Sequence, residues 1–190
     1  MRRDKDRVLD EYLAACARAG DRLAFSRLAD RWQPKLLRHA YRLVGDAEQA
    51  RDVVQDGWGD IVHGLKRLND AAAFPAWAYQ IVTRRAADHI RRNQRGRNLQ
   101  STFAAEPREQ LISSASIESY ADRGPLLTAL EKLSPDQQAT MHLFYVEGFT
   151  TSEISKALSI PTGTVKTRLM HSRQRLKELL EGENRHDCHR

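Results

Sequence analysis

The amino-acid sequence predicts an all-α protein made of two small helical domains joined by a flexible linker. Apolar residues recur at three- and four-residue spacing through most of the chain, which is typical of helices with one buried face. Helix start and stop signals separate these segments. Residues 98–124 are instead polar, rich in Ser and Ala, and without sustained apolar periodicity. We therefore expect domains at residues 1–97 and 125–181, a linker at 98–124 and a tail at 182–190.

Two helices are expected at the start of the first domain. The apolar stripe of the first, within residues 6–19, consists of Val8, Leu9, Tyr12, Leu13 and Cys16. Gly20 and Asp21 then act as a stop and as the cap of the next helix. The apolar contacts expected in that second helix are Leu23, Phe25, Leu28 and Trp32. Pro34 is expected to kink or restart it before the pattern continues to Gly45.

A helix expected at residues 46–65 has an apolar stripe and a separate acidic face. The stripe consists of Val54, Trp58, Ile61 and Leu65. The acidic face carries Asp52, Asp56 and Asp60 at four-residue spacing, with Gln55 beside them. Like charges at this spacing weaken an isolated helix, which suggests a cationic partner, although a solvated acidic face is an alternative. Gly57 and Gly59 each lower helix propensity by about 1 kcal/mol, so the helix needs tertiary support.

Residues 69–73 are expected to form a loop, after which Phe74 and Pro75 open a long helix with a basic end. Its inward residues are Trp77, Ile81 and Ile90, and its exposed cations are Arg84, Arg85, Arg91, Arg92, Arg95 and Arg97. Trp77 and Tyr79 lie one to two turns upstream of the cations. This pattern suits a single-stranded or melting nucleic acid, because rings stack on bases while arginines hold phosphates. Core aromatic residues and a solvated basic helix end are the alternatives.

The second domain is expected to begin near Pro125 with two helices. The first runs through Leu126, Leu127, Leu130 and Leu133. Ser134 to Gln137 is a start signal for the second, with a cap, a proline at the first helical position and a glutamine three residues after the cap. That helix contains Met141, Leu143, Phe144 and Val146 and is expected to end at Gly148.

Residues 149–180 have the pattern of a helix-turn-helix. Thr150 and Glu153 can form a capping box ahead of an apolar face at Ile154, Ala157 and Leu158. Residues 159–163 contain a proline and a glycine and are expected to form the turn, with a second helix starting near Thr164. The inward residues of this helix are Val165, Leu169, Leu176 and Leu180, and its opposite face carries Lys166, Thr167, Met170, His171, Arg173 and Gln174.

Side chains of the latter kind reach phosphates and base edges, so this face predicts DNA binding. An ordinary helical hairpin with solvated cations is the alternative. The net charge is +6 and the isoelectric point is about 9.6. Residues 74–97 hold six Lys and Arg against one acidic residue, and residues 149–180 hold six against two. The rest of the chain is net negative, so the positive charge forms two islands, more than a single-site DNA binder obviously needs.

Several classes of protein find no support in the sequence. The charged N-terminus is followed by no apolar segment of signal-peptide length, and no run approaches the roughly 20 apolar residues of a membrane span, so we expect a cytoplasmic protein without membrane insertion. Two cysteines are too few for a disulfide framework. His186, Cys188 and His189 stand close together in a tail that we expect to be disordered and to bind no metal stably. No phosphate-binding loop, dinucleotide turn or nucleophile-base set indicates an enzyme, a cofactor or a small-molecule substrate.

The order of these segments resembles that of a bacterial RNA polymerase sigma factor of the extracytoplasmic-function, or group IV, type. The similar segments are residues 42–58, 74–92, 130–155 and 162–176, four in the right order with a linker between the two pairs. The resemblance implies a protein that binds core RNA polymerase and promoter DNA and directs transcription initiation, with no active site of its own. An anti-sigma factor is a further partner that the family commonly has.

Matching positions carry the family's roles onto this chain. The residues similar to those that dock on the clamp of the largest polymerase subunit are Asp52, Val53, Gln55 and Asp56. The loop that captures a flipped base of the −10 element corresponds to residues 69–74, with Asn69, Asp70 and Phe74 as candidates. The helix that engages the melting strand supplies Trp77, Asp88, Arg91 and Arg92, to which the basic surface adds Arg84 and Arg85. The helix that reads the −35 element supplies Thr164, Lys166, Arg168 and Arg173, to which the exposed face adds Thr167, Met170 and His171.

The sequence departs from the family pattern at a few positions and leaves two other readings of its function. The departures are Arg51, Gly57, Gly59, Arg84 and His171, and they bear on clamp affinity and promoter sequence more than on class. A helix-turn-helix regulator whose first half binds a ligand or dimerises is one alternative, but it leaves the acidic helix and the first basic island unexplained. A sigma-like decoy that binds only a regulatory protein is the other.

Overall fold

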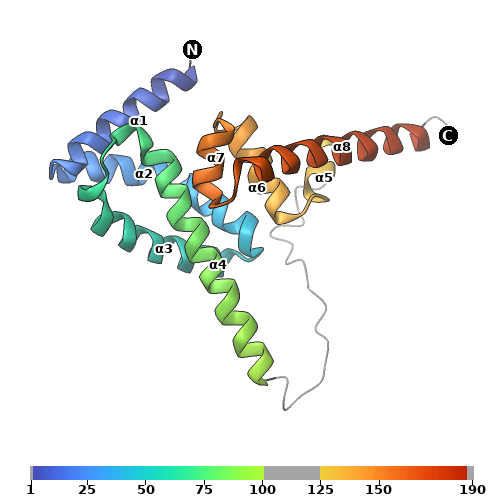
Figure 1. The fold of residues 1–190 in the computed structure, drawn as a ribbon, viewed down its shortest axis with the longest axis horizontal. Helices are drawn as coiled ribbons and strands as arrows, with labels where there is room; N and C mark the ends of the chain where they lie inside the picture. The colour runs from blue at the N-terminus through green and yellow to red at the C-terminus, as the bar shows by residue number, and fades with distance from the viewer. Residues whose placement is uncertain (1, 101–124, 188–190) are drawn as a thin grey trace. The chain divides into compact units, whose positions relative to one another are not determined.

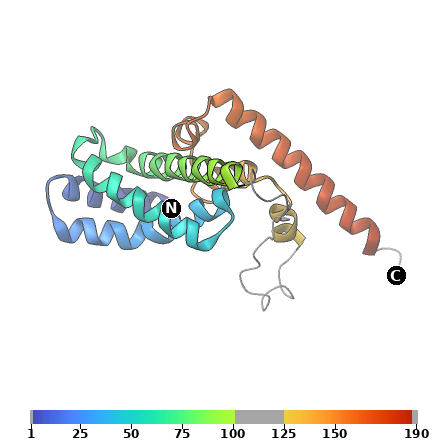
Figure 2. The ribbon, with the colours of Figure 1, turned by 90° about the horizontal axis from the view of Figure 1, so that it is seen from below.

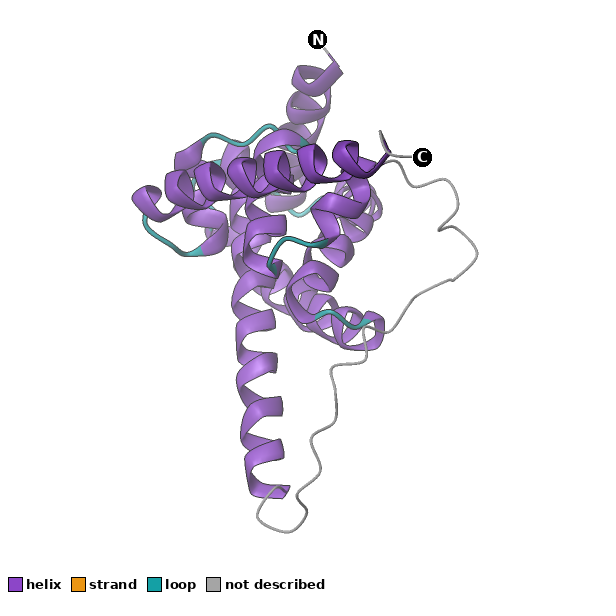
Figure 3. Cartoon of the chain, turned by 90° about the vertical axis from the view of Figure 1, so that its right-hand side faces the viewer, coloured by secondary structure: helices purple, strands orange, loops and turns teal. Residues whose placement is uncertain are grey.

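The computed structural model describes residues 2–100 and 125–187, and all regular structure within them is helical (Figures 1 and 3). The predicted all-α class is confirmed. The elements before the gap are α1 (Arg2–Arg18), α2 (Arg22–Val44), α3 (Ala47–Gly64), the 3₁₀ turns η1 (Leu65–Arg67) and η2 (Ala71–Ala73), and α4 (Phe74–Gln100). Those after it are α5 (Pro125–Glu131), α6 (Pro135–Tyr145), α7 (Thr151–Leu158) and α8 (Thr162–Asp187).

The chain divides into two compact units, of which the first contains all of α1–α4 and the second contains α5, α6, α8 and most of α7. The expected linker is outside the described residues except at its start, because α4 continues to Gln100. Likewise α8 continues to Asp187, so the first residues of the expected tail are helical. Each unit is therefore held together by its own helices.

Helix α2 is the centre of the first unit, because it packs against α1, α3 and α4 (Figures 1 and 2). Its Trp32 is buried, with its ring centroid 5.3 Å from that of Phe74 and 5.5 Å from that of Tyr79. Other buried side chains are Leu28, Leu36, Val53, Val54, Ile61 and Val82. Burial of such side chains stabilises a fold by about 1.5–3 kcal/mol each. The last turns of α4 extend beyond the other helices of this unit.

Local helix signals behave as the sequence predicts. Asp21 caps α2 by accepting hydrogen bonds from the backbone N–H groups of Leu23 and Ala24, at 2.8 and 3.0 Å. Gly45 ends that helix with a φ of 78°, a left-handed conformation that a glycine adopts without steric cost. Asp46 then caps α3. The stop of α2 and the cap of α3 are therefore adjacent residues.

The apolar faces expected for the first two helices are wrong in part. The buried face of α1 consists of Asp10, Leu13, Ala14 and Ala17, whereas Val8 and Tyr12 are exposed. Asp10 is buried because it accepts a hydrogen bond from Arg31 Nε at 2.8 Å, so the predicted stripe is rotated toward the charged residue. The ion pair also raises the pKa of Arg31.

Leu23, predicted as an apolar contact, is likewise exposed. Pro34 does not restart α2 but lies inside one continuous helix. Both Pro34 and Asp30 are exposed, so water can satisfy the backbone carbonyl that loses its partner to the proline.

The second unit is built on α8, which packs against α5 and α6. Ser134 and Gln137 form the predicted capping box of α6, with Ser134 Oγ accepting from the Gln137 N–H at 3.3 Å and Gln137 Oε1 accepting from the Ser134 N–H at 3.1 Å. The buried residues around this contact include Ala129, Leu133, Ala139, Leu143, Val165, Leu169 and Leu176. Val146, expected to pack, is exposed. A left-handed Gly148 separates α6 from the segment that leads into α7.

Candidate functional site

The α7–turn–α8 segment forms as the sequence predicts. Thr150 Oγ1 accepts from the Glu153 N–H at 3.2 Å, and Glu153 Oε2 accepts from the Thr150 N–H at 2.7 Å, which completes the capping box. The turn is closed by a hydrogen bond from Ser155 Oγ to the carbonyl of Ile160, at 2.6 Å. Helix α8 begins at Thr162, two residues earlier than expected, because the Val165 N–H already bonds the Pro161 carbonyl.

The outward face of α8 carries the side chains predicted for DNA contact. Every member of the predicted face is exposed: Lys166, Thr167, Met170, His171, Arg173 and Gln174. Thr164 is exposed as well. On the opposite face Val165, Leu169, Ser172 and Leu176 are buried. The fold therefore presents these residues together on one side of one helix, which is the arrangement with which a helix reads the major groove.

Cations of this face differ in whether the protein already pairs them. Arg168 is half-buried and forms an ion pair with Asp136, at the start of α6, at 2.5 Å. Lys166 and Arg173 have no carboxylate partner in the part of the chain that the structure describes. Arg173 instead donates from Nε to the phenol oxygen of Tyr145 at 2.8 Å. Lys166 and Arg173 are thus the cations of this face whose charge is available to phosphates.

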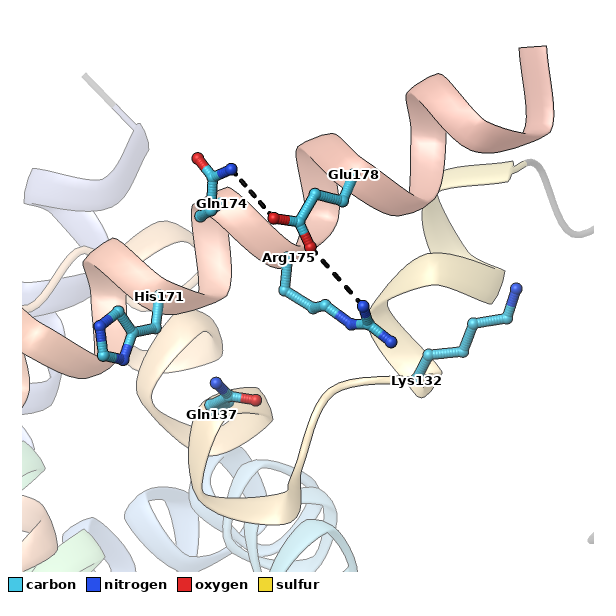
Figure 4. A pocket seen from close by; sticks show the side chains of 6 residues that line it. All are labelled: Lys132, Gln137, His171, Gln174, Arg175 and Glu178. Carbon is cyan, nitrogen blue, oxygen red and sulfur yellow. Dashed lines mark hydrogen bonds and ion pairs between the residues drawn. The ribbon is translucent and has the colours of Figure 1, made fainter. Parts of the chain in front are cut away.

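An open depression of about 370 Å³ lies beside the second half of this face (Figure 4). Figure 4 shows Gln174 and Arg175 turning toward Glu178, at 3.0 and 3.6 Å, with Lys132 and Gln137 on the other wall. Glu178 reduces the positive charge here. The depression is polar and open, unlike the enclosed apolar pockets that take small molecules, so we assign it no ligand.

The acidic face predicted on α3 is present in part. Asp52, Gln55 and Asp56 are exposed, as a docking role needs. Val53, assigned to the same role, is only 2% exposed, because it belongs to the inward stripe that packs in the core. The assignment of Val53 as a contact is therefore wrong. Its position next to Asp52 on the helix is what makes the two residues look like one motif in the sequence.

Asp60, the third carboxylate of the row, is already paired within the protein. Arg85 of α4 donates to it from Nε at 2.6 Å and from Nη2 at 2.5 Å, a two-point ion pair between α3 and α4. Hydrogen bonding by Arg85 lowers the pKa of Asp60, and the same bonds raise the pKa of Arg85. This pair leaves Asp52 and Asp56 as the carboxylates available to a partner, and it commits Arg85 to a structural contact.

The loop before α4 presents two of its three candidates. Asn69 and Asp70 are exposed, and Asp70 Oδ1 accepts from the Ala72 N–H at 3.0 Å. Phe74 is fully buried against Trp32, so its ring is not available to a nucleic-acid base, and its assignment as a contact is wrong. Phe74 follows the loop directly and is the first residue of α4, and its side chain packs in the core of the first unit.

Arg18 of α1 holds this loop in place, a role that the sequence did not indicate. Its Nη1 donates to the carbonyl oxygens of Leu68 and Asn69, at 2.7 and 2.9 Å. The contact fixes the loop backbone from α1, about fifty residues away in sequence. No local spacing could have shown this, because the partners are backbone atoms of a distant segment.

The aromatic residues of α4 divide between core and surface. Tyr79 is fully buried, with its ring 5.5 Å from Trp32 and 4.9 Å from His39, so the core alternative holds for it. Trp77 is half-buried, and its ring lies so close to Gly64 that a side chain there would overlap it. Of these two rings, only Trp77 has surface left for a base.

The arginines farther along α4 are mostly exposed. Arg84, Arg92 and Arg95 are exposed without a carboxylate partner among the described residues, while Arg91 pairs with the half-buried Asp88 at 2.5 Å. The side chain of Arg97 lies outside the described residues. The first basic island therefore keeps a cationic surface after Arg85 is set aside.

A metal site and a membrane span both lack support in the described residues. Within the described residues, no group of three or more His, Cys, Asp or Glu side chains is placed to hold a metal ion. His186, Cys188 and His189 lie outside the part of the chain for which side chains are described. Among the helices that the structure describes, none is both long and apolar enough to cross a membrane.

Comparison with known families gives two matches along the chain. Residues 28–96 match Sigma-70 region 2, and residues 123–176 match Sigma-70, region 4. The first covers α2–α4 with the acidic face and the first basic island. The second covers α5–α7 and the part of α8 that carries the exposed face.

Curated relatives and solved structures of the same kind cover most of the chain. The chain is 30% identical to the ECF RNA polymerase sigma factor SigL of Mycobacterium tuberculosis over 166 residues, 87% of this chain and 93% of that protein. It is 33% identical to the RNA polymerase sigma-E factor of Streptomyces avermitilis over 176 residues, 87% of this chain and 89% of that protein. The sigma factor RpoE of Bartonella quintana, solved in complex with the anti-sigma factor NepR, matches with a TM-score of 0.61 and 26% identity, over 83% of this chain and 96% of that one.

Proposed function

We propose, from the premise that this chain belongs to the sigma-70 family and to its extracytoplasmic-function branch, that one of its surfaces docks on core RNA polymerase and two others bind promoter DNA. The chain is a sigma factor, which binds core RNA polymerase and directs promoter recognition and transcription initiation. Such a protein is a regulatory subunit rather than an enzyme.

The observation that carries the proposal is the separation of unpaired charges. Asp52 and Asp56 on α3 have no ion pair in the described chain, and neither do Arg84 and Arg92 on α4 or Lys166 on α8. Exposed charges without an internal partner can pair with a surface of opposite charge. Here the exposed carboxylates suit a cationic protein surface, and the two sets of cations suit phosphates.

The acidic surface of α3 is proposed to dock on the clamp of the largest polymerase subunit. An apolar groove of about 490 Å³ between α2 and α3, lined by Phe25, Trp58 and Val62 among others, continues from it along the same helix. The ring of Trp58 packs edge-on against Phe25, with their centroids 5.9 Å apart. An apolar groove beside unpaired carboxylates fits a protein partner, since interfaces combine an apolar centre with a polar rim.

The −10 element is proposed to contact Asn69, Asp70, Trp77 and the exposed arginines of α4. Extracting a base from the stack costs a few kcal/mol, which hydrogen bonds and stacking in a pocket must offset. The loop suits this role because Arg18 holds its backbone in place. The −35 element is proposed to contact α8 through Thr164, Lys166, Thr167, Met170, His171 and Arg173.

Reversing the charge of the α3 surface tests the docking proposal. The double variant Asp52→Lys and Asp56→Lys is expected to weaken binding of core polymerase at least tenfold, because close charge pairs at interfaces contribute about 1.5 kcal/mol or more each. The measurement is the affinity of the full chain for core polymerase, with circular dichroism to check the fold. Glu11→Lys on α1, also an exposed carboxylate, is the control and should bind normally. Unchanged affinity in the double variant would refute the docking role.

An anti-sigma factor is proposed as a further partner, and the cytoplasm, where the polymerase works, as the place of action. The support is the likeness to RpoE of Bartonella quintana, a sigma factor solved with an anti-sigma factor. Affinity purification of the full chain from its own cells, followed by mass spectrometry, should recover either polymerase subunits or a second protein that competes with them. Recovery of neither would count against both partners.

A further inference from the structure

Arg173 of α8 lies on a platform of two aromatic side chains at the end of α6. Its guanidinium carbon is 5.5 Å from the ring centroid of Phe144 and 5.7 Å from that of Tyr145. Its Nε donates to the Tyr145 phenol oxygen at 2.8 Å. The two rings are themselves packed edge to face, with centroids 5.0 Å apart. Three contacts therefore fix the position of one arginine side chain.

These contacts differ from those of the other arginines on the same helix. Arg168 is neutralised by Asp136, and Arg175 lies 3.6 Å from Glu178. The partners of Arg173 are a neutral hydroxyl and two ring faces, which orient a guanidinium without cancelling its charge. The side chain is thus held and yet fully cationic.

The hydrogen bond to Tyr145 uses Nε and leaves both terminal amino groups of Arg173 for another acceptor. These groups form the planar fork that binds a phosphate or a guanine edge at two points. An arginine that is already held loses less conformational entropy on binding than one whose side chain is free to change rotamer. Orientation of the fork by the platform should therefore raise affinity for DNA.

We infer that Tyr145, supported by Phe144, is a positioning residue that presents Arg173 to the DNA of the upstream promoter element. The inference rests on the proposed role of α8 and adds to it a residue from another helix. Tyr145 does not itself touch DNA in this account. Its hydroxyl acts through Arg173, so its effect on binding exists only while Arg173 is present.

A role in core packing explains the contact between Tyr145 and Arg173 less well than a positioning role does. Tyr145 is 47% exposed and Arg173 is exposed, so their contact buries little apolar surface. Tyr145→Phe keeps the ring and its packing while it removes the hydroxyl. The variant should therefore fold normally, and comparison with and without Arg173 shows how much of any loss of DNA affinity depends on that arginine.

A double-mutant cycle tests the inference. The four proteins are the wild type, Tyr145→Phe, Arg173→Ala and the double variant, each as holoenzyme with core polymerase. The probe is a labelled duplex that carries only the upstream element of a promoter located by transcription start mapping, and the readout is the equilibrium affinity at several salt concentrations. Tyr41→Phe, which removes an exposed hydroxyl of the first unit, is the matched control and should not change this affinity.

Tyr145→Phe is expected to weaken binding about two- to tenfold, the effect of one net hydrogen bond, in the wild-type background. In the Arg173→Ala background it should change affinity less than about twofold. Equal losses in both backgrounds, or no loss in the first, would overturn the positioning role while the role of α8 stands. No loss with Arg173→Ala alone would refute the DNA contact of Arg173 itself, and with it the inference. The three results are distinguishable within one experiment.

Discussion

Two adjacent arginines of α4 have different surroundings, which the sequence alone does not show. Arg85 makes a two-point ion pair with Asp60 across the contact between α3 and α4, whereas Arg84 is exposed and has no carboxylate partner among the described residues. A helix turns by about 100° per residue, so neighbours in sequence face different surroundings. One residue serves the fold and the other is available to DNA.

Alanine substitutions at these two positions should separate stability from DNA binding. Arg85→Ala is expected to lower the free energy of unfolding by about 0.5–1 kcal/mol, as for a partly exposed ion pair. Arg84→Ala should change it by less than about 0.5 kcal/mol but should weaken DNA binding and reduce the salt dependence by about one phosphate contact. Urea unfolding and salt titration of promoter binding by the holoenzyme measure the two effects. The assignment fails if the two variants behave alike.

The same ion pair gives stability a dependence on pH. Asp60 has a lowered pKa in the folded protein, so its contribution is present above its unfolded pKa of about 3.9 and is lost as the pH falls through the lowered value. The difference in unfolding free energy between wild type and Arg85→Ala should therefore shrink below about pH 4. A difference that stays constant down to pH 2 would contradict the pairing.

For single residues, the sequence predicted which side chains are exposed better than it predicted which partners they have. All six residues predicted for the outer face of α8 are exposed, because helical periodicity alone decides which side they occupy. Phe74 and Val53 were misassigned, because a motif includes core residues as well as contact residues. The partners of Arg18, Arg31 and Arg85 are in segments distant in sequence, and nothing in local spacing reveals them.

The two glycines within α3, Gly57 and Gly59, have different surroundings. A Cβ atom at Gly57 would lie 3.2 Å from Val82 Cγ2 of α4, whereas a Cβ at Gly59 would meet nothing within 4 Å. Val82 is buried and β-branched, so it has little freedom to move away. Gly57 thus permits the close approach of α3 and α4, which also brings Asp60 to Arg85.

Alanine at these two glycines should change stability in opposite directions. Gly59→Ala is expected to raise the free energy of unfolding by about 0.5–1 kcal/mol through helix propensity. Gly57→Ala is expected to lower it by about 1 kcal/mol or more, because the added methyl group overpacks the contact with Val82. Denaturant unfolding with an unchanged m-value measures both. Stabilisation by Gly57→Ala would show that α4 can yield and that the close approach is not required.

The sequence predicted helix ends well in both units. It predicted the buried faces of the helices less well in the first unit. The caps at Asp21 and Thr150 and the stop at Gly45 depend on residues next to them in sequence, so local chemistry suffices. The buried face of α1 could not be read from apolar residues, because Asp10 replaces one of them through its pairing with Arg31. Pro34 was expected to kink or restart α2, and the helix continues through it without a restart.

For the molecule as a whole, the separation of positive and negative surfaces was visible in the sequence. This separation supports the proposal that different surfaces bind DNA and the polymerase. Two basic islands and one acidic face separate into different helices, which suits a protein that must hold DNA at two places and an enzyme at a third. Phosphate contacts in both islands should make promoter binding strongly dependent on salt. Sequence could predict the helices and these surfaces, but it could not predict which charges the fold itself pairs.

The most direct test of this two-point account is a hydroxyl-radical footprint of the holoenzyme on a mapped promoter. The variants are Lys166→Ala with Arg173→Ala in one protein, and Arg91→Ala with Arg92→Ala in another. The first should lose protection around the −35 element and keep it around the −10 element, and the second should show the reverse. Equal loss of both protected regions in either variant would contradict the assignment of one helix to each element.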